Sequence, residues 1–113
     1  MKAINTTAII IGIAITFISC TAAKNTASVI TYTQNVKAII DFNCASSCHN
    51  VLKPAGGIDL TTYDKVKYQA LEGKLLMAIQ HAEGAKAMPK RADKLDDATI
   101  QVVVNWVAGG ASL

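Results

Sequence analysis

One short run of side chains constrains this chain more than any other feature. Three residues separate Cys44 from Cys48, and His49 follows Cys48 directly. Such a run is typical of covalent haem attachment, in which two thiols add to the vinyl groups and the imidazole binds the iron. Because the usual spacer has two residues, we expect one of residues 45–47 to loop out, and whether the Cys44 bond forms stays open.

The N-terminal residues have the order of an export signal. Lys2 precedes an apolar run over residues 8–18, and small residues follow it. This order is typical of secretory signals, and the run is shorter than the roughly 20 residues that span a bilayer. Residues 17–20 are similar to the lipobox of bacterial lipoproteins. We expect a signal peptide over 1–19 and a lipid on Cys20; the alternative is a cleaved signal that merely contains a cysteine.

The rest of the chain is long enough for one domain. Small and polar residues over 20–31 predict a flexible tether, so the domain is expected over 32–113. Removal of residues 1–19, whose only charged side chain is Lys2, lowers the formal net charge from +3 to +2. This balance gives no reason to expect nucleic-acid binding.

Apolar side chains recur at helical spacing, and no long stretch alternates with a period of two. We therefore predict an all-α fold of about four short helices. The first helix is expected over 32–43, with Tyr32, Val36, Ile39 and Ile40 on one face.

The other helices are predicted from their end signals. A capping-box pattern at 61–64 predicts the start of the second helix. A third is expected over 74–82, with Gly84 as its C-cap. The last is expected to begin at the N-cap Asp96, with Trp106 on its apolar stripe.

Four features, taken together, resemble the class I c-type cytochromes, most closely their planctomycete-type cytochrome c-like domains. They are the run that ends in Cys48-His49, the Gly-Gly-Ile-Asp-Leu segment at 56–60, Met88-Pro89, and the segment over 95–111 that contains Asn105-Trp106. The resemblance implies one covalent haem c surrounded by the helices. It also implies attachment through Cys44 and Cys48, with His49 and Met88 as the iron ligands.

The second iron ligand has two rivals in the sequence. A Met88 and His49 pair would raise the haem potential, which suits an electron carrier, and Pro89 restricts the backbone of Met88. His81 and Met77 both project away from the apolar face of the predicted third helix. If neither Met88 nor a rival bound the iron, the open position on the iron would bind small gases or peroxide, and the chain would be a haem sensor.

Two hypotheses without haem use the same residues. Cys44 and Cys48 could form a disulfide in a structural lipoprotein, although so small a ring adds little stability. Alternatively, the cysteines and the two histidines could bind zinc, although His81 stands far from His49, unlike the paired ligands of zinc motifs.

The functional expectation is electron transfer with redox protein partners, outside the cytoplasm of a bacterium and held to a membrane by lipid. We find no acid–base pair in the sequence that would make the chain an enzyme by itself. Lys86, Lys90, Arg91 and Lys94 flank Met88 and predict either an ordinary solvated loop or a surface for an acidic partner. The alternative function is a haem-bearing subunit of a larger oxidoreductase.

Overall fold

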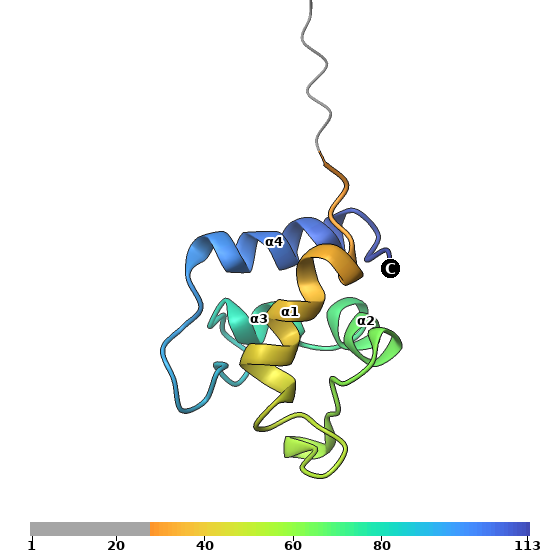
Figure 1. Cartoon of the computed structure of the whole chain (residues 1–113). Coiled ribbons are helices and arrows are strands. Elements are labelled where there is room, and N and C mark those ends of the chain that lie inside the picture. Colours follow the sequence, from red (N-terminus) through yellow and green to blue (C-terminus); the bar gives the residue numbers. More distant parts are fainter. Residues whose placement is uncertain (1–27) are drawn as a thin grey trace, which may run out of the picture.

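The structure is a computed structural model that describes residues 28–113. The predicted signal peptide, Cys20 and most of the tether lie outside the described residues. Every regular element of the described part is a helix, which confirms the all-α prediction there (Figure 1). The elements are η1 (Tyr32–Val36), α1 (Lys37–Ile40), η2 (Asp41–Ala45), η3 (Ala55–Gly57), α2 (Tyr63–Leu71), α3 (Leu75–Ile79) and α4 (Asp97–Ala108).

The first three elements form one continuous helical segment, as predicted, and it ends two residues later than expected. Its N-cap, Thr31, accepts a hydrogen bond from a backbone N–H of the first turn. Tyr32, Val36 and Ile40 repeat every four residues and are buried, because this spacing puts them on one face. The segment ends one residue after Cys44, and residues 46–48, which follow it, are exposed.

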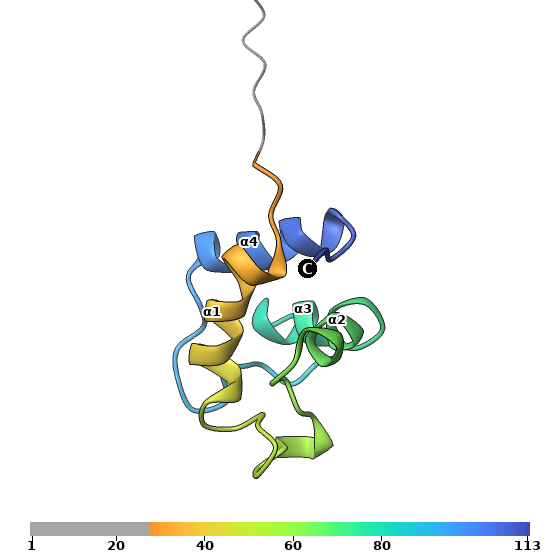
Figure 2. The ribbon, with the colours of Figure 1, turned by 45° about the vertical axis from the view of Figure 1, so that its right-hand side comes forward.

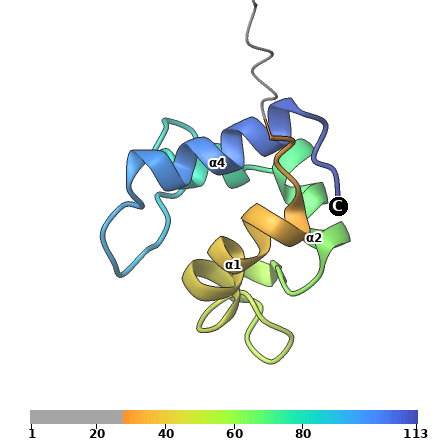
Figure 3. The ribbon, with the colours of Figure 1, turned by 45° about the horizontal axis from the view of Figure 1, so that its top comes forward.

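Helix α4 closes the core against the start of this first segment (Figures 1 and 3). Asp96 caps α4 by accepting a hydrogen bond from Thr99 N at 2.8 Å, as predicted. Trp106 is fully buried, and its ring centre lies 5.9 Å from that of Tyr32. The indole N–H donates to the carbonyl of Ser112 at 2.8 Å, which satisfies its polar atom inside the core.

Two sequence predictions about helix ends are wrong. The N-cap of α2 is Thr62, because the Thr61 hydroxyl instead donates to Asp59 Oδ1 at 2.6 Å. Helix α3 stops at Ile79, since His81 takes a left-handed conformation with φ of 56°. Gly84 has φ of 87° but lies in the turn that follows, so it does not cap the helix.

Among the helices of residues 28–113, none has both the length and the apolar character that a membrane span requires.

Candidate haem-binding site

The extra residue between the cysteines is wound into the helix end and does not loop out as we expected. His49 N donates to Cys44 O at 2.9 Å, and Ser46 N donates to Asp41 O at 3.0 Å. Both bonds span five residues, whereas an α-helical bond spans four. With a two-residue spacer, the bond from cysteine to histidine would span four. A π-type turn therefore absorbs the insertion, and Ala45 is buried within it.

The two cysteines differ in their surroundings. Cys44 extends the buried row of the first helical segment and packs against the core, whereas Cys48 is exposed. Burial, with a smaller contribution from Cys48, raises the pKa of the Cys44 thiol to about 11. Both side chains are free thiols. They are therefore chemically available to a haem, with Cys44 protonated at neutral pH.

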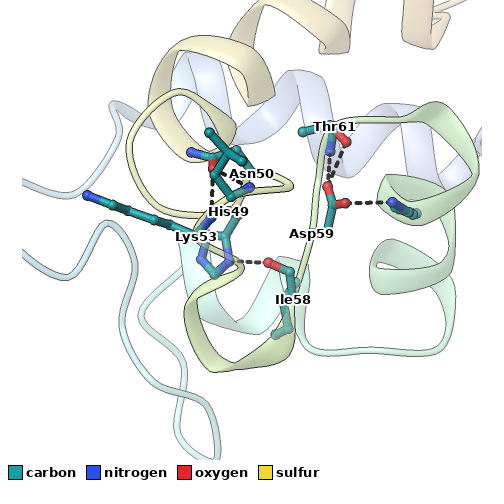
Figure 4. A network of polar contacts seen from close by, with 8 residues as sticks. His49, Asn50, Lys53, Ile58, Asp59 and Thr61 are labelled. Atoms are coloured by element: carbon teal, nitrogen blue, oxygen red, sulfur yellow. Dashed lines mark hydrogen bonds and ion pairs between the residues drawn. The ribbon is translucent and has the colours of Figure 1, made fainter.

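His49 is held so that one ring nitrogen is left for a ligand. The residue is 9% exposed, and its Nδ1 lies 3.0 Å from the carbonyl oxygen of Ile58 (Figure 4). Because a carbonyl only accepts, Nδ1 carries the proton, and a neutral ring then keeps its lone pair on Nε2. Metal-bound histidines commonly donate their second N–H to a backbone carbonyl in this way. The ring thus has the tautomer and the fixed orientation of a metal ligand.

The glycine pair of the 56–60 segment brings that carbonyl to the histidine. Gly56 and Gly57 have φ of 65° and 75°, which glycine adopts without the strain of a side chain. A Cβ added at either position would meet no heavy atom within 4 Å, so glycine is needed for conformation and not for space. The chain then returns past the histidine, and Leu60 N donates to His49 O at 2.8 Å.

Asn50 ties the loop to the helix end, a role that we did not predict. Its Oδ1 accepts from Lys53 N at 2.9 Å (Figure 4) and from Leu52 N at 3.0 Å. Its Nδ2 donates to Ala45 O at 3.1 Å. Asparagine commonly bonds to backbone groups two or three residues away, which was the signal available in the sequence.

Asp59 holds the other side of the loop against α2. It accepts from Lys65 Nζ at 2.5 Å, from Thr61 N at 2.8 Å and from the Thr61 hydroxyl (Figure 4). The ion pair with Lys65 and the bonds from Thr61 lower the pKa of Asp59 to about 2. The carboxylate is therefore ionised over the whole neutral range. Its bonds to Thr61 and Lys65 hold Asp59 in place, directly after the Ile58 carbonyl that contacts His49.

Met88 lies in the long connection between α3 and α4, the blue loop below α4 in Figures 1 and 2. It is half-buried, and its backbone is fixed on both sides. Met88 N donates to Ala78 O at 3.0 Å, and His81 Nε2 lies 3.0 Å from Met88 O. Among the described residues, no hydrogen bond joins Met88 to His49. Met77 is 37% exposed on α3.

The predicted basic residues are exposed, and among them Lys94 lies 4.0 Å from Asp97 Oδ1. Within residues 28–113, no three His, Cys, Asp or Glu side chains gather as metal ligands do.

A scan against protein-family models, a search of curated proteins and a search of solved structures found no match to this chain. The donor set itself suits a haem c: two free thiols, an imidazole whose Nδ1 is bonded to a carbonyl, and a thioether.

Proposed function

We propose that this chain is a monohaem c-type cytochrome that transfers single electrons. Cys44 and Cys48 would hold the haem covalently, with His49 and Met88 as the iron ligands. The observation that carries the proposal is the bond from His49 Nδ1 to the Ile58 carbonyl. It leaves Nε2 as the coordinating atom of a buried, oriented ring that directly follows a cysteine.

The choice of Met88 over His81 rests on the resemblance of the Met88-Pro89 segment and on the soft thioether donor that it offers. The bond from His81 Nε2 to the Met88 carbonyl would be broken by coordination through Nε2 but leaves Nδ1 with a lone pair, so it does not by itself exclude His81. Met88, in contrast, spends only backbone groups on its hydrogen bonds. Its thioether sulfur, a soft donor, remains available to coordinate the haem iron.

A bound haem would supply the one-electron redox chemistry, and the residues of this chain would keep its surroundings constant. His49 is held at its ring and at both backbone groups. Met88 is held at both backbone groups. Ligands held in this way need little rearrangement when the charge on the site changes, which favours electron transfer.

We also propose a lipid anchor on Cys20, a location outside the cytoplasm, and redox partners with acidic surfaces. The support is the order of the N-terminal residues and the exposed basic side chains near Met88. Whether the chain works alone or as a subunit of a larger oxidoreductase would follow from what copurifies with it from its native membrane.

The test is the pyridine haemochrome spectrum of the full chain made in bacteria with a c-type maturation system. We expect the band of a haem whose two vinyl groups are both consumed. Cys44→Ser should shift this band to the position for one remaining vinyl group, and Ser47→Ala, in the same spacer, should not. A chain without covalent haem would overturn the proposal. Rapid, complete CO binding by the reduced protein at neutral pH would instead favour the sensor.

A further inference from the structure

His81 is an exposed side chain with a specific bond. Its Nε2 lies 3.0 Å from Met88 O, and because the carbonyl accepts, Nε2 carries the proton. The sequence interval between the two residues is seven, so this bond closes the loop that leads from α3 to Met88. The residue also has φ of 56°, which asparagine, aspartate and histidine tolerate better than most other residues with a side chain.

The bond matters because little else holds the chain near Met88. On its N-terminal side, Met88 N donates to Ala78 O, and Lys74 Nζ donates to Gly84 O at 2.7 Å. From residue 89 to residue 95, no hydrogen bond to another element is present among the described residues. The Met88 carbonyl is therefore the last hydrogen-bonded point of the chain before Leu95 packs against the core at the start of α4.

We propose that His81 is a positioning residue for Met88. Its N–H holds the Met88 carbonyl, fixes the backbone from which the thioether projects, and so favours the return of the sulfur whenever it leaves the iron. This inference rests on the proposed haem function, in which Met88 is an iron ligand.

The side chain and the left-handed backbone of His81 can be tested separately. Glutamine places an amide N–H at nearly the reach of Nε2 but fits the left-handed conformation less well. Asparagine fits that conformation but is too short to reach the carbonyl. His81→Gln and His81→Asn therefore form a matched pair, and His81→Ala removes both features.

The experiment follows the ferric holoprotein by the charge-transfer band of the methionine sulfur–iron bond and by titration with imidazole, which competes for the Met88 position. We expect His81→Ala and His81→Asn to weaken the band and to raise the apparent affinity for imidazole about threefold to tenfold, the scale of one net hydrogen bond. His81→Gln should stay near wild type. Gln80→Ala, an exposed neighbour whose side chain has no hydrogen bond to the described residues, should match wild type.

Wild-type behaviour of His81→Ala would overturn the inference. Full rescue by His81→Asn would overturn it as well, because the backbone conformation alone would then explain the effect. Covalent haem in the wild type without the sulfur–iron band would refute Met88 as the ligand, and this inference with it. Wild-type protein without covalent haem would instead refute the proposed function itself.

Discussion

The two loops that carry the proposed iron ligands are built differently. The His49 loop, residues 44–60, is crossed by backbone bonds from His49 to Cys44, from Ala55 to Cys48 and from Leu60 to His49, all between 2.8 and 2.9 Å. Side chains of Asn50 and Asp59 add further bonds. The first half of the Met88 loop, residues 80–95, is joined to α3 by the backbone N–H groups of residues 80–82 and of Met88, and to the N-cap Lys74 through Gly84. Its second half makes no hydrogen bond to another described element.

This difference indicates that the chain fixes the proposed His49 site along its whole loop and the proposed Met88 site only as far as Met88 itself. Local stability follows the density of buried contacts and protected hydrogen bonds. We infer that the His49 side stays fixed, while the Met88 side can open without loss of the domain. Each prediction below tests this contrast.

The largest effect is expected from removal of each ligand in turn. His49→Ala should prevent accumulation of haem-loaded protein, because it removes the proposed iron ligand inside the fixed loop. Met88→Ala should keep the covalent haem but open the iron to CO and lower the reduction potential, because a methionine ligand raises it. Haem content, CO spectra and potentiometry would measure this, and equal haem loss in both variants would contradict the contrast.

Removal of one loop-binding side chain should destabilise only the His49 side. Asn50→Ala should lower the free energy of unfolding by about 0.5–1.5 kcal/mol, because it removes hydrogen bonds to backbone groups that are mostly exposed and can bond to water instead. Arg91→Ala, an exposed change in the Met88 loop, should stay within about 0.5 kcal/mol. Denaturant titration of both holoproteins gives the comparison; similar losses would show that the two loops are equally constrained.

The pH dependence of stability should show the contribution of the Asp59 carboxylate. Since folding lowers its pKa from 3.8 to about 2, its contribution is complete above pH 3.8 and is lost as the pH falls through about 2. The stability difference between wild type and Asp59→Asn should therefore shrink from about pH 5 to about pH 2. Asp64→Asn, an exposed change in the first turn of α2, serves as the control. If the difference in stability stays constant with pH, ionised Asp59 does not contribute the predicted pH-dependent stability.

The smallest effect concerns the basic side chains of the Met88 loop. Changing Lys90, Arg91 and Lys94 together to Gln should slow oxidation of the reduced protein by ferricyanide about threefold at low salt, because the anion is steered less. The advantage of the wild type should vanish at high salt. Lys67→Gln, on α2, is the control for the loss of one positive charge and is compared with Lys90→Gln alone as well as with the triple variant. If the triple variant is oxidised as fast as this control, these residues form an ordinary solvated loop and do not steer the anion.

The helical framework could be predicted from the sequence because its signals are local. Asp96 is a good N-cap, Trp106 lies on an apolar stripe, and Tyr32, Val36 and Ile40 repeat every four residues. Each of these depends on propensity and periodicity within one element.

The departures arise where a distant partner decides the conformation. Apolar periodicity continues past Ile79, but His81 turns away from the helix and bonds to Met88. The three-residue spacer gave no sign of a π-type turn, because the bonds of His49 to Ile58 and Leu60 help to fix its end. The Ile58 carbonyl itself carries no sequence signal, since every residue has one.

The central claim is that haem is bonded to this polypeptide through its cysteines. The most direct measurement is the intact mass of the full chain after extraction with acidified organic solvent, which removes haem held only by the iron and by contacts. We predict that the mass of one haem stays on the protein and is lost when Cys44 and Cys48 are both changed to Ser. A polypeptide without added mass, or haem that the solvent removes, would contradict the account.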